Sequence, residues 1–392
     1  MGEVPQVLVE EILERLDVKS LVRFTSVSKQ WSSMIKSRSF ALRHLIRAQS
    51  RDPHILVGGD QLRCESNPYP WLRTLELLDP FIMVNYIPKP NRTSTQFTQS
   101  CDGLVCIYDF EQVVYVFNPA TRWCRFLPPA MIQQINNLSI SQVGISRRPF
   151  LGFGKDAVTS KYKIVWLYNP LEPDLDGQTT TCEVFDFTTY TWRHVIGSPH
   201  LICDDFKSHP VHLDGSINWL TAYLNGTTKI VCFDLHTEVF QVMSEIPIAH
   251  ADPHRSIMCS LHNRLCVSEM KRNNIQDIWL LNSLKVWEKT YSINLTLIVR
   301  LYGEYNGFPI SPVTVFDKTR LLYLHPIITQ PSLLIQDTIK ESDRFAFSGL
   351  DYFNHRFAKY DSKLDFDSKT IPKLESNAKV TQKPCEITAN LL

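Results

Sequence analysis

The residues best suited to hold a metal ion are a short run of cysteine, aspartate and histidine. Cys203, Asp204, His209 and His212 lie close together in the chain, with Pro210 between the two histidines. Thiolate, carboxylate and imidazole groups are the usual ligands of zinc. The run offers neither a Cys-x-x-Cys pair nor a helical His-x-x-x-His pair, so we predict no metal site and no cofactor.

Two glycines, Gly152 and Gly154 in LGFGKD, could suggest a loop that binds phosphate. A dinucleotide-binding loop needs a third glycine and leads into a helix, whereas the strand pattern KYKIVWLY follows here. We therefore predict a turn at these glycines. No Gly-x-Ser-x-Gly sequence marks a serine nucleophile, and Cys101 has no signature of a catalytic thiol. The sequence thus favours a protein that binds over an enzyme.

The segment that would position a binding surface is the first forty residues, whose apolar residues repeat at helical spacing. Three successive stripes are Val9, Ile12, Leu13 and Leu16; then Leu21, Phe24 and Val27; then Val27, Trp31, Met34 and Ile35. This spacing predicts three short amphipathic helices. A unit of about forty residues is near the lower limit for burying its own core. It should therefore pack against a partner protein or, as a helical cap, against the rest of the chain.

This segment also resembles an F-box. The match includes Val4-Pro5 at its start, EILERL from Glu11, KSLVRF from Lys19 and VSKQW from Val27. Val4 replaces the usual leucine. Asp17 replaces the usual proline between the first two helices, so we expect a looser turn there.

The resemblance implies a docking module for a Skp-type adaptor, which connects to a cullin–RING ubiquitin ligase. Carried over by position, the adaptor contacts are Val4, Pro5, Leu8, Ile12, Leu13, Leu16, Leu21 and Val27. Phe24, Trp31 and Ile35 are expected to form the core that holds the helices together. Some of the contact residues must also be internal, and the sequence does not separate the two groups.

After about Pro53 the pattern changes to short strands separated by turns. One unit recurs, in which an apolar strand is followed by Asp or Asn, a turn and an aromatic residue. Its copies begin VYVFNP at Val114, CEVFDF at Cys182, KIVCFD at Lys229 and, more weakly, DIWLLN at Asp277. The Asp or Asn side chain can bond to its own turn backbone. Such repeats predict a kelch-like β-propeller, with a β-sandwich as the alternative.

This region resembles the F-box-associated domain of plant F-box proteins, through CDGLVCIYD from Cys101, FNPATRWCRFLPP from Phe117 and LGFGKDAVTSKYKIVWLY from Leu151. We therefore expect an α+β chain in two parts. The predicted organisation is an F-box at 1–47, a connecting segment with the first strands at 48–100, an F-box-associated β domain at 101–360 and a disordered tail at 361–392.

Composition limits the possible partners and location. The formal net charge is +1, which gives no electrostatic case for nucleic acid or an anionic membrane. No secretory signal and no apolar run long enough to span a membrane is present. Ten cysteines without a regular framework read as reduced thiols of an intracellular protein, in the cytoplasm or nucleus. The end of the F-box segment is basic, which indicates a solvated face or, alternatively, contact with an acidic adaptor.

Together the resemblances imply a non-catalytic substrate-recognition subunit of a ubiquitin ligase. The target protein should meet loops of the β domain, because scaffolded loops carry binding. Candidate loops are 169–177, 200–210 and 301–309, and their candidate residues are Asp174, Asp204, Asp205, Tyr302, Tyr305 and Phe308. Two alternatives remain open: an F-box scaffold or regulator outside a cullin ligase, and a kelch-like propeller lectin or enzyme.

Overall fold

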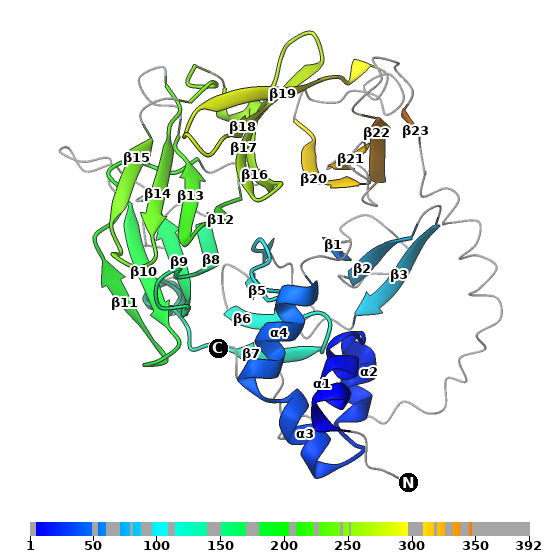
Figure 1. Cartoon of the computed structure of the whole chain (residues 1–392). Helices are drawn as coiled ribbons and strands as arrows, with labels where there is room; N and C mark the ends of the chain where they lie inside the picture. The colour runs from blue at the N-terminus through cyan, green and yellow to red at the C-terminus, as the bar shows by residue number, and fades with distance from the viewer. Residues whose placement is uncertain are drawn as a thin grey trace, which may run out of the picture.

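The structure is a computed structural model. It describes residues 5–48, 54–59, 71–78, 81–87, 96–108, 114–138, 150–169, 180–203, 209–222, 227–243, 246–250, 252–296, 309–316, 320–325, 332–337 and 345–346. Four helices come first and are followed by sheets arranged around a common centre (Figure 1).

The chain begins with α1 (Gln6–Glu14), α2 (Val18–Phe24), α3 (Lys29–Ile35) and α4 (Arg38–Ala48). The first three confirm the predicted amphipathic helices. The fourth was not predicted, although Ser37 gives it a local start signal. The Ser37 hydroxyl accepts a hydrogen bond from the Phe40 backbone at 3.2 Å, as an N-cap serine does.

The turn between α1 and α2 is well fixed, so the expected loosening at Asp17 is wrong. Asp17 caps α2, where its carboxylate accepts hydrogen bonds from the Ser20 backbone at 2.7 Å and the Ser20 hydroxyl at 3.0 Å. Aspartate is among the best residues at this position, because it satisfies a free backbone N–H at the start of a helix. A side-chain cap thus fixes the start of α2 in this chain.

The strands form six sheets in the part of the chain that the structure describes. The first sheet has three strands, β1 (His54–Gly59), β2 (Trp71–Leu78) and β3 (Phe81–Ile87). The next two have four each: β4 (Gln96–Phe97), β5 (Val105–Tyr108), β6 (Val114–Asn118) and β7 (Trp123–Phe126); then β8 (Phe150–Lys155), β9 (Tyr162–Tyr168), β10 (Thr181–Asp186) and β11 (Thr191–Val195).

Three more four-stranded sheets complete the set. They are β12 (Val211–Leu213), β13 (Ser216–Leu220), β14 (Ile230–Asp234) and β15 (Phe240–Met243); β16 (Ser256–Leu261), β17 (Arg264–Met270), β18 (Ile275–Leu281) and β19 (Trp287–Asn294); and β20 (Ser311–Phe316), β21 (Arg320–His325), β22 (Ser332–Asp337) and β23 (Phe345–Ala346). A short 3₁₀ turn, η1 (Pro253–Arg255), precedes β16.

All neighbouring strands within a sheet are antiparallel, and in three cases the first strand of one sheet contacts the first strand of the next. Such contacts join β8 to β12, β12 to β16 and β16 to β20. First strands that meet around a centre are the arrangement of a β-propeller, not of a sandwich. The predicted propeller is therefore confirmed. The predicted boundary at residue 101 falls between β4 and β5, which are strands of one sheet.

The repeated unit is the hairpin between the third and fourth strands of a sheet. Asn118, Asp186, Asp234 and Asn282 each accept a hydrogen bond from the backbone N–H two residues ahead, at 2.6–2.9 Å. Each turn then contains a residue of left-handed backbone, namely Arg122, Tyr190, Glu238 and Lys285. The predicted aromatics, Trp123, Trp192, Phe240 and Trp287, all lie on the returning strand.

The two glycines of LGFGKD lie inside strand β8, so the predicted turn is wrong. The nearest atoms to a Cβ built on Gly154 would be His212 Cδ2 at 2.2 Å, and on Gly152 they would be Ile217 Cγ2 at 2.6 Å. Both neighbours belong to the next sheet. The glycines therefore allow two sheets to approach closely near the centre.

Candidate functional site

One candidate surface lies on the outside of α1 and on the turn between α2 and α3. Leu8 is 49% exposed, Ile12 57% and Val27 59%, and Pro5 is also exposed. Leu8 and Ile12 are one turn apart on α1 and therefore lie on one side of it. A hydrogen bond of 3.2 Å from Gln30 Nε2 to Gln6 Oε1 holds the start of α1 beside the start of α3. We call Leu8, Ile12 and Val27 the apolar patch.

The structure divides the predicted contact set into exposed and internal side chains. Leu13 and Leu21 are buried with Ile35 and Phe40 in the core of the helices, so their side chains do not lie on the surface. Leu16 is half-buried against the same core. The sequence pattern placed Leu13, Leu16 and Leu21 on apolar faces, and the packing of α3 and α4 decides which residues are covered. Val7, which was not predicted, is 66% exposed, and Val4 lies outside the described residues.

The predicted core residues do pack together. Ile35 is fully buried, and Phe24 and Trp31 are half-buried against the core with their rings edge to face at 5.7 Å. Each stripe of the pattern thus contributes to one small core. Within α1 to α4, the buried large side chains are Leu13, Leu21, Ile35 and Phe40.

One of the basic residues at the end of the F-box forms ion pairs within the F-box. The Arg43 guanidinium of α4 forms ion pairs with Glu10 and Glu14 of α1. Its hydrogen bond to Glu14, with the charge of Glu10, raises the pKa of Arg43. His44 adds a 2.9 Å contact from Nε2 to the Leu16 carbonyl. These bonds fix α4 along α1.

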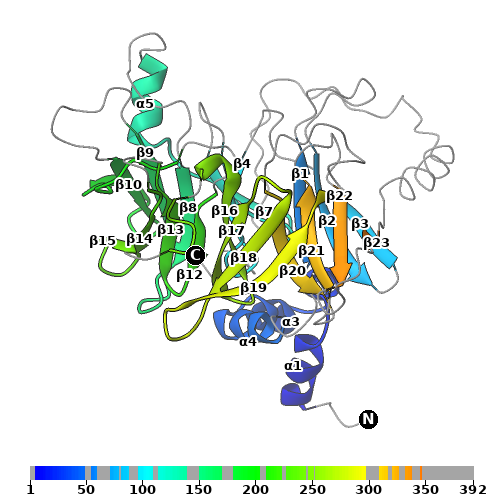
Figure 2. The ribbon, with the colours of Figure 1, turned by 90° about the horizontal axis from the view of Figure 1, so that it is seen from above.

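A second candidate surface lies at the other end of the sheets. Helix α5 (Met131–Leu138), which was not predicted, stands there, and α1, α3 and α4 lie at the opposite end (Figure 2). Because α5 connects β7 to β8, this end of the sheets also receives the other connections between sheets. The flanking strands of all three predicted loops end here: β9 and β10, β11 and β12, and β19 and β20.

The six residues predicted to contact a target cannot be placed. Asp174, Asp204, Asp205, Tyr302, Tyr305 and Phe308 lie outside the described residues. What the structure does describe is how two of the flanking segments are held. The Asn169 side chain bonds to both the backbone N–H and the carbonyl of Ile202, at 3.0 and 2.8 Å, and Gln276 does the same to Ile310, at 2.8 and 2.7 Å.

A buried carboxylate anchors α5. Glu183 of β10 accepts hydrogen bonds from the backbone N–H groups of Met131 at 2.8 Å and Ile132 at 3.0 Å, and from the Tyr168 hydroxyl at 3.2 Å. The free N–H groups and the dipole at the start of a helix stabilise a negative charge. Helix α5 is thus fixed to the next sheet, which sequence reasoning missed because its capping residue is distant in the chain.

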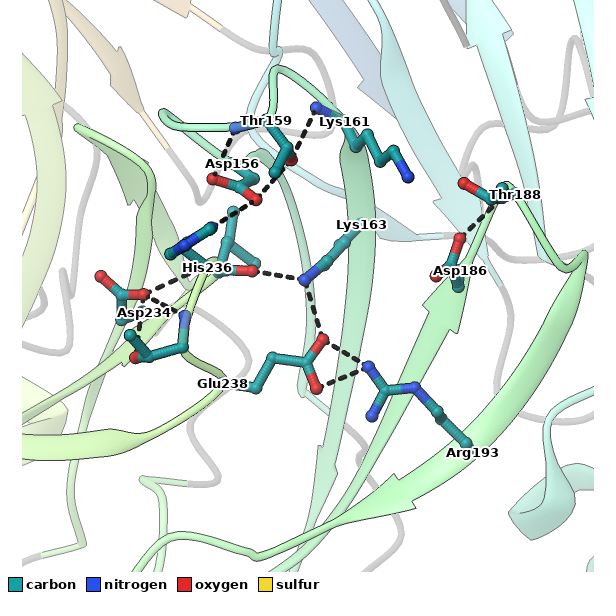
Figure 3. A network of polar contacts seen from close by, with 12 residues as sticks. Asp156, Thr159, Lys161, Lys163, Asp186, Thr188, Arg193, Asp234, His236 and Glu238 are labelled. Atoms are coloured by element: carbon teal, nitrogen blue, oxygen red, sulfur yellow. Dashed lines mark hydrogen bonds and ion pairs between the residues drawn. The ribbon is translucent and has the colours of Figure 1, made fainter.

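A polar network joins the second and third four-stranded sheets (Figure 3). Glu238 accepts hydrogen bonds from Lys163 at 2.8 Å and from Arg193, and Asp156 lies 3.2 Å from His236 Nδ1. Burial alone would raise the pKa of Asp156. Hydrogen bonds from Thr159, Val158 and His236 outweigh this and lower that pKa to about 2. These contacts connect one sheet to the next, and we interpret the network as a link between sheets.

The predicted absence of a metal site meets no contrary observation in the residues that the structure describes, where no group of three or more His, Cys, Asp or Glu side chains comes together. The His212 ring is packed on β8, where Nε2 lies 3.1 Å from the Lys155 backbone nitrogen. Burial raises the pKa of Cys101 to about 12, which does not suit a nucleophile. No described helix has the length and apolar character needed to cross a membrane.

Comparison with known proteins agrees with both regions. The family model described as F-box domain matches residues 2–43, and that described as F-box associated beta propeller domain matches residues 72–324. F-box protein At2g34280 of Arabidopsis thaliana is 41% identical over 358 residues, covering 83% of this chain and 90% of the relative. F-box/LRR-repeat/kelch-repeat protein At1g09650 of the same plant is 40% identical over 371 residues, covering 88% and 93%.

Among solved structures, AofleA from Arthrobotrys oligospora is 11% identical with a TM-score of 0.44, covering 76% of this chain and 87% of that one, which is too slight a likeness to support an argument. The family assignment rests instead on the two matched regions, in the order of the helices and sheets described above. This chain belongs to the family of F-box proteins that carry an F-box-associated β-propeller domain.

Proposed function

We propose that the protein is the substrate-recognition subunit of a Skp–cullin–F-box ubiquitin ligase, in which the F-box docks a Skp-type adaptor and the propeller binds the target. The observation that supports this most directly is the exposure of the apolar patch on a helical unit with a very small core. Exposed apolar side chains on short helices are suited to a partner's groove. Catalysis would come from proximity, since a bound target is held near the ubiquitin carrier.

The propeller would present its target surface at the end that carries α5, away from the F-box helices (Figure 2). This separation suits an adaptor subunit, because ligase and target could bind at once without competing. We also propose that the protein works in the cytoplasm or nucleus, where ubiquitin ligases of this kind would meet their targets.

The test is adaptor binding by the full chain with Leu8→Asp and Ile12→Asp together. We expect affinity for a Skp-type adaptor of Arabidopsis thaliana to fall about 100-fold or more, since buried interface anchors each contribute about 2 kcal/mol or more. Ile196→Asp is the matched control, because Ile196 is an exposed apolar residue of the propeller. Unchanged binding by the double variant would contradict the interface.

A cullin added to the same experiment separates the ligase subunit from a scaffold. A chain that binds the adaptor and also recovers the cullin supports the ligase role. A chain that binds the adaptor but excludes the cullin supports the alternative of a regulator outside the ligase.

A further inference from the structure

The helices that carry the apolar patch also carry exposed cations. Residues 5–48 contain eight Lys and Arg but four Asp and Glu, a formal net charge of +4, whereas the whole chain carries +1. The positive excess is therefore concentrated in the F-box. Charge of one sign near a docking surface steers association with a partner of opposite sign.

The ion pairs of the F-box determine where this excess lies. Glu10 and Glu14 are both bound to Arg43, on the side of α1 that meets α4. The carboxylate of Asp17 is directed to Ser20 as a helix cap. Three of the four acidic side chains are thus held in internal bonds, and Glu11 is the exposed acid that remains near the patch.

Lys19, Arg23 and Lys29 have exposed side chains. Lys19 and Arg23 are one turn apart on α2 and therefore lie on one side of that helix. Arg23 and Lys29 flank Val27, and the bond between Gln6 and Gln30 brings this turn beside the start of α1. Arg23 and Lys29 therefore lie on either side of Val27 in the chain, with Lys19 one turn before Arg23, and we call these three cations the border.

We propose that this border selects an adaptor whose F-box-binding groove is edged by carboxylates, with Lys19, Arg23 and Lys29 as specificity-determining residues. The inference rests on the proposed function and adds the chemistry of the partner. The apolar patch supplies most of the affinity, because exposed ion pairs contribute little. The cations chiefly raise the association rate and disfavour adaptors with a neutral or basic rim.

The experiment measures association and dissociation rates of the full chain with purified Skp-type adaptor of Arabidopsis thaliana, between about 0.1 and 1 M salt, where the Debye length falls from about 10 to about 3 Å. For the natural sequence we expect the association rate to fall about tenfold across this range. Lys19→Glu with Arg23→Glu should slow association about tenfold at low salt and remove most of the salt dependence, with little change in dissociation.

The matched control is Lys161→Glu with Arg272→Glu, which changes the net charge equally at exposed positions of the propeller. It should associate nearly as the natural sequence does. Lys19→Gln with Arg23→Gln should give an intermediate rate, and circular dichroism with thermal unfolding establishes that each variant keeps its helices.

Tight binding that is insensitive to salt and to the reversal would overturn this inference and leave the proposed function standing. Equal slowing by the control pair would also overturn it, because the effect would then follow net charge and not the border. Absence of binding by the natural sequence would instead overturn the proposed function itself.

Discussion

The F-box and the propeller hide their apolar residues to very different extents. The F-box has a small buried core of Leu13, Leu21, Ile35 and Phe40, and Leu8, Ile12 and Val27 remain at the surface. The propeller buries continuous apolar clusters that cross from one sheet to the next, and these clusters include the buried side chains of Trp166 and Trp219. A region that completes its own core can serve as a rigid scaffold. A region that leaves apolar surface exposed gains stability when a partner covers it.

The comparison predicts two separable unfolding events, and core truncations should give the largest effects. Trp166 is fully buried and packs with its ring near Tyr108 and Trp192. Trp166→Ala should lower the free energy of unfolding of the propeller by about 3–5 kcal/mol, whereas Ile35→Ala should lower that of the F-box by about 2–5 kcal/mol. Hydrogen exchange followed by mass spectrometry measures the two regions separately.

Adaptor binding provides the second measurement for this pair. Ile35→Ala should abolish binding while the propeller keeps its protection from exchange. Trp166→Ala should leave binding in place. If either substitution destabilised both regions equally, the F-box and propeller would form one cooperative unit, and the comparison would fail.

The second-largest effect is expected at Glu183, the buried carboxylate that caps α5. Glu183→Ala would leave the N–H groups of Met131 and Ile132 without their acceptor. Loss of hydrogen bonds to a buried charged group should cost about 3 kcal/mol. Amide exchange in α5 should accelerate strongly, with Glu183→Gln less affected because it keeps an acceptor oxygen. If α5 in both variants kept the protection from exchange that it has in the natural sequence, apolar contacts of Ala130 and Ile132 would be what holds the helix.

A somewhat smaller effect is the acid sensitivity that Asp156 gives the propeller. Its pKa in the folded state is about 2, below its ordinary value of 3.8. The charged form is thus favoured by folding. The resulting stability is present above pH 4 and is lost as the pH falls from 4 to 2.

Asp156→Asn should therefore lower propeller stability by about 2 kcal/mol at pH 7, and should flatten the pH dependence between 4 and 2. Urea unfolding at a series of pH values measures both. An unchanged acid slope would mean that other carboxylates dominate the acid response.

Features with a local cause could be predicted from the sequence, and features with a distant cause could not. The turns at Asp186 and Asp234 were predicted because each carboxylate bonds to a backbone N–H two residues ahead. The start of α5 depends on Glu183, 51 residues away from Ile132, and the closeness at Gly154 depends on His212 in the next sheet. The spacing of residues in the sequence does not show that Glu183 meets Ile132 or that His212 meets Gly154.

The same limit explains the mixed result for the F-box. The helical pattern located its apolar faces, and Ile12 and Leu13 both belong to them. Which face becomes core depends on where α3 and α4 pack, and α4 was itself missed. The residues predicted to contact a target fell in segments that the structure does not describe, so that part stays a prediction.

The smallest effect is expected for the ion pairs that join α4 to α1 in the F-box, and its size shows whether ion pairs or apolar packing hold α4. Arg43 pairs with two glutamates, but its side chain is 43% exposed, so solvent screens these pairs. A double-mutant cycle of Arg43→Ala and Glu14→Ala should give a coupling of about 0.5 kcal/mol at low salt, falling towards zero at 1 M salt. Hydrogen exchange of the full chain measures this coupling, because it reports the stability of the F-box while the propeller is still attached. A coupling above about 2 kcal/mol would mean that ion pairs stabilise the F-box, whereas buried apolar area stabilises the propeller.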